Sequence, residues 1–145
     1  FTPFQWAQMC TKEEFLERAY IVKDKFKEML NRKSLKYNYH EADLTVLEGV
    51  LARGDRRVAA VVEEVYKNGA MFDSWGEYFN NDNWMQAFET CGVDPDFYTV
   101  RKRSLDEIFP WDFIDAGVTK EFLKREWLTA ISEKVTPNIW RRCLL

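Results

Sequence analysis

The sequence predicts a mainly α-helical protein of the α+β class, with about six helices in an irregular bundle and one or two short strands. Capping signals precede several runs in which apolar residues recur at helical spacing. Only Leu35–Tyr39 alternates in the way a half-buried strand does. The 145 residues, 46% of them hydrophobic, suffice for a folded core. Helices should therefore dominate the fold.

The first helix should follow a short aromatic segment. Pro3 interrupts Phe1–Trp6, which suits the end of a strand or an extended loop. Thr11 and Glu14 have the spacing of a capping box, in which each side chain satisfies the other residue's free N–H group. Apolar residues then recur at helical spacing among lysines and glutamates, so we expect a helix from Thr11 to about Leu30.

The strand prediction rests on Leu35, Tyr37 and Tyr39, which alternate with polar residues. A single strand is not stable without a partner. The partner is the N-terminal segment, a second copy of the chain, or sequence outside it. An unpaired Leu35–Tyr39 edge also favours self-association.

Two helices should follow as a hairpin. Leu44–Leu51 has helical spacing, and Gly54 is expected to close this helix in a left-handed conformation. Asp55 is a candidate N-cap for a helix that runs to Asn68 and ends at Gly69.

The rest of the chain is less regular. Met71–Asn83 is rich in aromatic residues and predicts a loop, and Asp82 is expected to cap a short helix over Trp84–Cys91. Ser104 begins a second capping-box pattern, but Pro110 allows only about one helical turn after it. The last helix should begin at Thr119, end at Thr136-Pro137-Asn138, and bury Phe122, Leu123, Trp127, Leu128 and Ile131.

Charge and cysteine content narrow the class of protein. The net charge of −3 argues against bulk binding to nucleic acid or to an anionic membrane. Cys10, Cys91 and Cys143 are far apart and lack CxxC spacing, as is typical of reduced cytosolic thiols. No signal peptide or long apolar run is present, so we expect a cytoplasmic protein. The aromatic start without methionine suggests the interior of a larger protein.

The first candidate site is the turn that carries Arg53, Asp55, Arg56 and Arg57. Guanidinium groups beside a helix N-terminus suit a phosphate or carboxylate ligand. The alternative is a capped turn in which the arginines pair with acids nearby.

The second candidate is a site wall formed by Trp111, Asp112, Asp115 and Lys120. Carboxylates among aromatic side chains can have raised pKa values suited to acid–base chemistry. The alternative is that both aspartates cap backbone N–H groups around Gly117. Trp75 is a further candidate for the wall, or else part of the core. No catalytic residue is assigned and no metal site is predicted, because the one histidine lacks partners at ligand spacing.

Three segments together resemble the C-terminal part of large bacterial radical S-adenosylmethionine proteins that carry an N-terminal cobalamin-binding-like domain. These segments are Leu51–Arg57 (LARGDRR), Phe72–Phe79 (FDSWGEYF) and Pro110–Leu123 (PWDFIDAGVTKEFL). The opening FTPFQW resembles the segment where the partial α/β barrel of the radical core closes. The resemblance implies that residues 1–40 end that core, that residues 41–145 form a helical accessory region, and that the strands are remnants of the barrel.

The same resemblance implies an iron–sulfur oxidoreductase that uses a four-iron four-sulfur cluster and S-adenosylmethionine, with cobalamin as a further cofactor. The cluster needs a CxxxCxxC loop, which this sequence lacks. Related chains also tend to have cysteines soon after the Thr-Pro-Asn position, where Ile139 and Trp140 stand here. We therefore expect no cofactor in this chain, and a non-catalytic role in binding substrate or packing on the rest of the parent chain.

Two other interpretations stay open. A self-standing helical module would bind a protein partner through its aromatic surface. The RNA-contacting region of a tRNA-modifying enzyme would bind through its basic clusters, with an affinity that falls steeply as salt is added.

Overall fold

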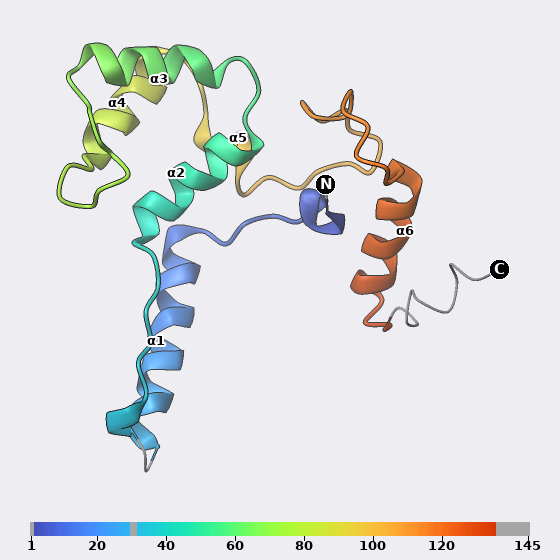
Figure 1. The fold of residues 1–145 in the computed structure, drawn as a ribbon, viewed down its shortest axis with the longest axis horizontal. Helices are drawn as coiled ribbons and strands as arrows, with labels where there is room; N and C mark the ends of the chain where they lie inside the picture. The colour runs from blue at the N-terminus through green and yellow to red at the C-terminus, as the bar shows by residue number, and fades with distance from the viewer. Residues whose placement is uncertain (1, 30–31, 136–145) are drawn as a thin grey trace. The chain divides into compact units, whose positions relative to one another are not determined.

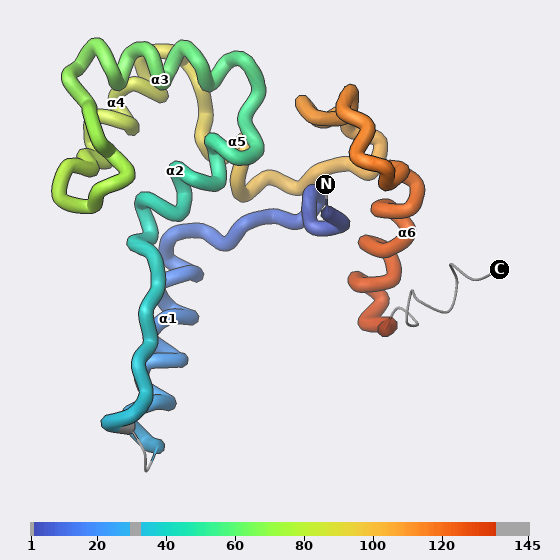
Figure 2. Tube along the Cα trace, viewed as in Figure 1, coloured from blue at the N-terminus to red at the C-terminus, as the bar shows by residue number. Residues whose placement is uncertain are grey.

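The computed structural model describes residues 2–29 and 32–135 and is mainly helical (Figure 1, and as a trace in Figure 2). The prediction of about six helices is confirmed. These are α1 (Lys12–Glu28), α2 (Ala42–Arg53), α3 (Val58–Lys67), α4 (Asn81–Thr90), α5 (Pro95–Tyr98) and α6 (Lys120–Ile131), with two short 3-10 helices, η1 (Pro3–Trp6) and η2 (Arg32–Ser34). None of the helices within the described ranges has the length and apolarity needed to cross a membrane.

Contacts within the chain divide it into two compact units. The terminal unit combines Phe1–Gln8 with Lys102–Leu145, and the central unit is Met9–Arg101. The expected subdivision into residues 1–40 and 41–145 refers to a larger barrel and stays a prediction. Phe1, Leu30, Asn31, Thr136-Pro137-Asn138 and Cys143 lie outside the described residues.

The strand prediction is wrong, because no β-strand occurs in the parts of the chain that the structure describes. Leu35–Tyr39 runs along α1 without regular structure. The rings of Tyr37 and Tyr39 lie 5.9 Å from those of Phe26 and Phe15 on α1. An extended segment that packs one side on a helix alternates just as a strand does, which explains the misleading pattern. The first residues also differ from the expected strand end, since Pro3–Trp6 forms η1.

The capping box at the start of α1 is confirmed. Glu14 N–H donates to Thr11 Oγ1 at 3.2 Å, and Thr11 N–H donates to the Glu14 carboxylate at 3.1 Å. An ion pair of 2.6 Å between Lys12 and Asp43 then connects α1 with α2. These local contacts fix where α1 begins and hold it beside the next helix.

The core of the central unit lies among α2, α3, α4 and α5. Its buried residues are Leu47, Val50, Val58, Val61, Val65, Trp84, Ala87, Phe88 and Tyr98. Gly54 does not have the predicted left-handed conformation, since its φ is −67°. A Cβ atom there would lie 2.7 Å from Val58 Cγ2 and 2.8 Å from the Val50 carbonyl oxygen, so close packing accounts for the glycine. Gly69, with φ of +89°, does end α3 as predicted.

Two further caps differ from the prediction. Asn80, not Asp82, caps α4, because Asn83 N–H donates to Asn80 Oδ1 at 3.2 Å. Asp55 accepts a hydrogen bond from Arg57 N–H, but the N-cap of α3 is Arg57 and the helix begins at Val58, two residues later than a cap at Asp55 implies.

The terminal unit has a small core formed by Trp6, Phe109 and Leu123. Thr119 caps α6 as predicted, through a hydrogen bond of 3.2 Å from Phe122 N–H. Only Leu123 of this helix is buried, and Phe122 and Trp127 are partly buried against the core. The predicted burial of Leu128 and Ile131 is wrong, since they are 52% and 58% exposed. The apolar face of α6 is therefore wider than the surface that η1 and the 102–119 segment provide for it.

Candidate functional site

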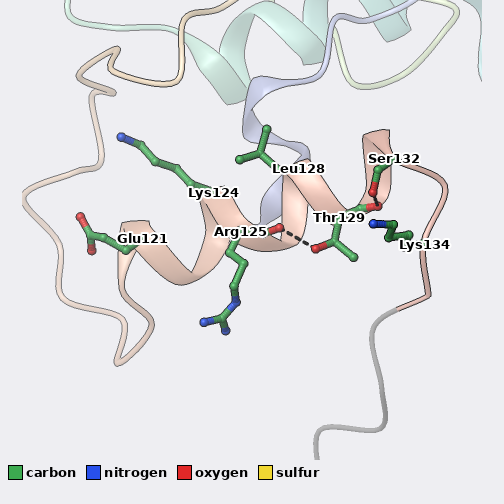
Figure 3. Close-up of a pocket in the computed structure, with 7 residues that line it drawn as sticks. All are labelled: Glu121, Lys124, Arg125, Leu128, Thr129, Ser132 and Lys134. Atoms are coloured by element: carbon green, nitrogen blue, oxygen red, sulfur yellow. Dashed lines mark hydrogen bonds between the residues drawn. The ribbon is translucent and has the colours of Figure 1, made fainter.

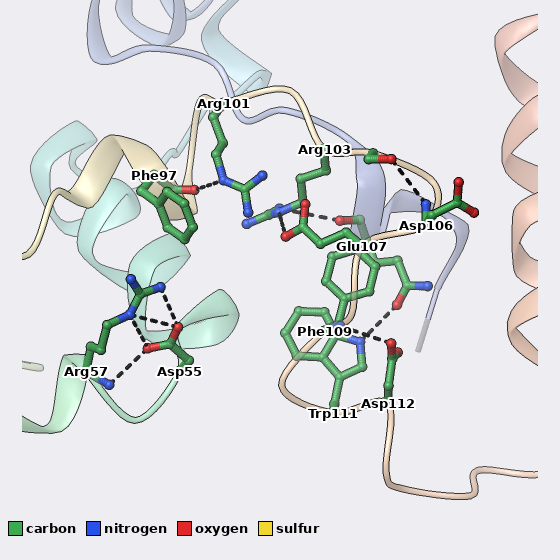
Figure 4. A network of polar contacts seen from close by, with 12 residues as sticks. Asp55, Arg57, Phe97, Arg101, Arg103, Asp106, Glu107, Phe109, Trp111 and Asp112 are labelled. Carbon is green, nitrogen blue, oxygen red and sulfur yellow. Dashed lines mark hydrogen bonds and ion pairs between the residues drawn. The ribbon is translucent and has the colours of Figure 1, made fainter.

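The predicted anion-binding turn lies in the central unit, between α2 and α3, and its acid and one of its arginines form a closed pair. Arg57 donates to both oxygens of Asp55 through Nε at 3.0 Å, and its Nη2 lies 2.6 Å from Asp55 Oδ2 (Figure 4). The hydrogen bonds from Arg57 lower the pKa of Asp55 to about 2. The same contact raises the pKa of Arg57. Asp55 thus occupies the side of Arg57 that would otherwise bind an anion.

Two aromatic residues of α5 complete this cluster. The hydroxyl of buried Tyr98 donates to Asp55 Oδ1 at 3.1 Å, and burial, followed by the contact with Asp55, raises the pKa of Tyr98. The guanidinium groups of Arg57 and Arg101 lie 4.9 Å and 4.1 Å from the centre of the Phe97 ring. Arg101 Nε also donates to the Phe97 carbonyl oxygen at 2.7 Å. Cation–π contacts and hydrogen bonds therefore tie the turn to α5.

Arg53 and Arg56 occupy different environments in the same turn. Burial lowers the pKa of Arg53, whereas the side chain of Arg56 is exposed to solvent. The structure therefore brings Asp55 and Arg57 together as a structural pair and leaves Arg56 facing water. The predicted role of all four residues in binding an anion stays a prediction.

The predicted site wall lies in the terminal unit and is built on stacked rings. The rings of Phe109 and Trp111 are parallel within 2°, with centres 5.1 Å apart (Figure 4). Trp6 meets Phe109 edge to face at 5.8 Å. The Trp111 indole N–H donates to Gln5 Oε1 at 2.9 Å, which fixes the orientation of the indole.

Asp112 and Lys120 lie together beside these rings. Asp112 accepts a hydrogen bond of 2.9 Å from Phe109 N–H and forms a short ion pair with Lys120. Lys120 also donates to the Glu107 carbonyl oxygen at 2.6 Å and lies 5.1 Å from the Phe109 ring centre. The ammonium group therefore has acceptors on two sides and an aromatic face on a third. Its geometry is that of a cross-link between α6 and the 107–112 segment.

Asp115 is separate from this pair. It accepts a hydrogen bond of 2.8 Å from Gly117 N–H, in the turn where Gly117 has φ of +71°. A cavity of about 120 Å³ is lined by Gln5, Asp112, Ile114, Val118, Lys120 and Leu123, without Asp115. Such a volume holds a few water molecules or one small side chain. The acid–base role of the two aspartates stays a prediction.

Trp75 belongs to neither cluster. It lies in the 71–80 loop of the central unit with 62% of its surface exposed, and its backbone N–H donates to the Phe72 carbonyl oxygen at 2.9 Å. Beside it, Asp73 Oδ2 accepts a hydrogen bond of 2.8 Å from the indole of Trp84.

Arg103, in the basic run Arg101-Lys102-Arg103, was not identified as a candidate from the sequence. Its side chain is 3% exposed and forms an ion pair of 3.9 Å with Glu107. The guanidinium lies 5.9 Å from the Phe109 ring centre and 3.4 Å from the Gln5 carbonyl oxygen. The four-residue spacing of Arg103 and Glu107 indicates an ion pair, but it carries no information on the burial of Arg103.

A wider groove of about 460 Å³ follows the exposed side of α6 (Figure 3). Leu128 lies among polar side chains there. The Thr129 hydroxyl donates a hydrogen bond to the Arg125 carbonyl oxygen, and the Ser132 hydroxyl donates one to the Thr129 carbonyl oxygen. Lys124, Arg125 and Lys134 give the groove a basic rim. This groove was not predicted, because Leu128 was expected to be buried.

The described residues do not form a thiolate site for the iron–sulfur cluster implied by the resemblance. A four-iron four-sulfur cluster needs several thiolates in one place. Cys10 and Cys91 are separate free thiols, and no group of three or more His, Cys, Asp or Glu residues suited to a metal ion occurs within residues 2–29 and 32–135.

Comparisons with protein-family models, with curated proteins and with solved structures found no match for this chain.

Proposed function

We propose that this chain is the C-terminal, non-catalytic helical region of a radical S-adenosylmethionine iron–sulfur oxidoreductase, where it packs on the remainder of the parent protein. In this proposal the parent uses a four-iron four-sulfur cluster and S-adenosylmethionine, with cobalamin as a further cofactor, all held outside the residues described above. The three sequence segments with the family resemblance support the assignment, and the exposed apolar surface of the terminal unit supports the mode of action.

The main support for the proposal is that the terminal unit, although small, exposes several large apolar side chains to solvent. Its core buries three large side chains. More than half of the surface is exposed for each of Phe4, Ile108, Phe113, Leu128 and Ile131. Single exposed apolar residues are common, but several in one small unit are typical of a surface that another protein covers. The remainder of the parent chain is the partner that the resemblance suggests.

The polar residues of the resembling segments support a binding role over a catalytic one. Asp55 is engaged by Arg57 and Tyr98, and Asp112 by Lys120 and the Phe109 backbone. Groups that act as acids or bases need access to a substrate proton. These carboxylates instead hold turns and helices in place, as expected for a region that presents a surface.

The test has two parts, both on the protein as its source cell makes it. The intact mass should be well above 17.3 kDa, the mass of this chain. A photo-crosslinking phenylalanine analogue at Phe113 should then give a crosslink to a peptide of the same polypeptide. The matched control places the same analogue at Lys23, an exposed residue of α1 in the central unit.

Each result decides between the interpretations. An intrachain crosslink from position 113 that exceeds that from position 23 supports the proposal. A crosslink from position 113 to a different protein would favour the self-standing interaction module. Equal and weak crosslinking from both positions would show that Phe113 faces water, and the proposed docking surface would be abandoned.

A further inference from the structure

Charge is distributed unevenly along the central unit. Residues 68–100 contain no Lys, Arg or His, so all 21 Lys and Arg residues of the protein lie elsewhere. The same segment carries six acids, Asp73, Glu77, Asp82, Glu89, Asp94 and Asp96. A run with only negative charges produces a field that favours a cationic partner and repels an anionic one. The net charge of the whole chain is only −3, so it does not reveal this acidic segment.

A cavity of about 420 Å³ opens within this acidic segment. Its walls are residues 68–73, after the end of α3, together with Tyr78, Asn80 and Asn83. The rings of Phe72 and Tyr78 lie 6.3 Å apart at 58° to one another, so they form two inclined faces. Aromatic faces attract cations through their quadrupoles, and Arg and Lys are the cationic side chains that use such faces.

The backbone at Phe72 is held in an uncommon conformation. Its φ is +63°, in the left-handed region that non-glycine residues seldom adopt, and 69% of its surface is exposed. Such a conformation costs free energy, and burial of the ring does not offset the cost here. Met71, Trp75 and Tyr78 nearby are also more than half exposed. The loop therefore presents aromatic and apolar side chains to solvent at a conformational cost.

The electrostatics of the cavity wall favour positive charge. Asp73 contributes a carboxylate whose Oδ1 is buried and has no hydrogen-bond partner within the described residues, while Oδ2 is held by Trp84. The C-terminal end of α3, which carries a partial negative charge, adjoins the cavity at Asn68 and Gly69. The N-terminus of α4 opposes this effect, but Asp82 lies in its first turn.

We propose that this cavity binds a lysine or arginine side chain from a basic segment of another polypeptide. The inclined rings would contact the cation, and the Asp73 carboxylate would attract it. A polypeptide suits the region better than a small amine, because exposed Trp75 extends the apolar surface beyond the cavity, and Glu77 and Asp82 follow in the same stretch of chain. A nucleic acid would be repelled by the acidic segment.

The experiment measures fluorescence anisotropy of a short labelled peptide in which lysine alternates with glycine, titrated with the intact protein. A peptide with glutamate in place of lysine is the charge control. The lysine peptide should bind and the glutamate peptide should not. Affinity should fall as salt is raised from about 0.05 M to about 0.5 M, because exposed charges are then screened. Free lysine and spermidine serve as competitors.

Two variants test the cavity itself. Phe72→Gly removes the ring but suits the positive φ, so the protein should keep or gain thermal stability while binding weakens by about two- to fivefold. Asp73→Asn keeps an oxygen acceptor for Trp84 but removes the charge, and should also weaken binding. The matched controls are Tyr20→Ala and Glu17→Gln, which remove an exposed ring and an exposed charge from α1 and should leave affinity unchanged.

Each outcome supports or overturns the proposal. Weaker binding by both cavity variants, with unchanged binding by both α1 controls, supports it. Unchanged affinity in Phe72→Gly and Asp73→Asn would remove the cavity from the interaction. Absence of lysine-peptide binding at low salt would overturn the proposal outright. If free lysine or spermidine matched the peptide in affinity, the ligand would be a small amine instead. None of these results depends on how the terminal unit docks.

Discussion

The Asp55 carboxylate and the Tyr98 hydroxyl form a hydrogen bond of 3.1 Å between residues that are 43 positions apart in the sequence. This bond joins the turn after α2 to α5, while Arg57 holds the other side of the same carboxylate. A polar contact therefore connects these two segments of the central unit, in addition to the apolar core. Several measurable properties follow from this cluster and from the packing around it.

The stability of the central unit should depend on the ionisation of Asp55. The pKa of Asp55 is about 2 in the folded protein, below its ordinary value of 3.8. Because the folded pKa is depressed, the stabilisation is complete above about pH 4 and is lost as the pH falls towards 2. The pair is partly exposed, so we expect a loss of about 1 kcal/mol. Urea unfolding at a series of pH values measures it, and Asp55→Asn should remove this part of the pH dependence.

Tyr98→Phe should weaken the protein by removing the hydroxyl that donates to Asp55. The ring stays in the core, and only the hydroxyl that donates to Asp55 is lost. We expect the free energy of unfolding to fall by about 1 kcal/mol. The change should be much smaller in an Asp55→Ala background, which has no side-chain acceptor for the hydroxyl, as a double-mutant cycle would reveal. Equal effects in both backgrounds would argue that the hydroxyl contributes nothing through Asp55.

Gly54→Ala should be strongly destabilising, although the φ of Gly54 is ordinary. The added Cβ would meet Val58 Cγ2 and the Val50 carbonyl oxygen at less than 3 Å, so α2 and α3 must move apart. We expect a loss of about 1–3 kcal/mol in the free energy of unfolding, measured by chemical denaturation. Gly76→Ala is the matched control, because no atom lies within 4 Å of the position of its added Cβ. Similar effects of both substitutions would refute the packing explanation.

Removal of the Arg103 charge should affect the terminal unit more through burial than through the ion pair. Arg103→Ala removes the ion pair with Glu107 and opens space beside Phe109, so we expect a loss of about 3 kcal/mol. Arg103→Met fills much of that space and should lose less. Urea unfolding measures the loss, followed by tryptophan fluorescence, to which Trp6 and Trp111 contribute together with the other tryptophans of the chain. If Met and Ala were equally harmful, the charge itself would be the dominant contribution.

The parts of the fold that were predicted correctly depend on local chemistry. Thr11 and Thr119 cap their helices through residues three positions away, and Gly69 ends α3 by its own conformational freedom. Such contacts leave a pattern within a few residues of sequence. The alternation in Leu35–Tyr39 is also local, but a strand and an extended segment packed on a helix share it.

The parts that were not predicted depend on distant residues. The close approach of Val58 to Gly54 decides the role of that glycine, and the exposure of Leu128 depends on how much of α6 the rest of its unit covers. The candidate sites show the same limit. The acids and bases could be identified by residue type, but their partners could not. Tyr98, the partner of Asp55, is 43 residues away in the sequence, and Gln5, the partner of Trp111, is 106 residues away.

The terminal unit is assembled from residues 2–8 and residues 102–135, which has a consequence for folding kinetics. The hydrogen bond between Gln5 and Trp111 closes a loop of about 100 residues, and the entropy of that closure must be lost before the contact stabilises anything. The contacts between neighbouring helices of the central unit have shorter separations, and one hydrogen bond, from Met9 N–H to the Thr99 carbonyl oxygen, joins its two ends. On the ribosome the central unit can therefore fold while the N-terminal segment with Trp6 still awaits its partner. The slow step of folding, and the stage most prone to aggregation, should be the late capture of that segment by the newly made 102–135 region.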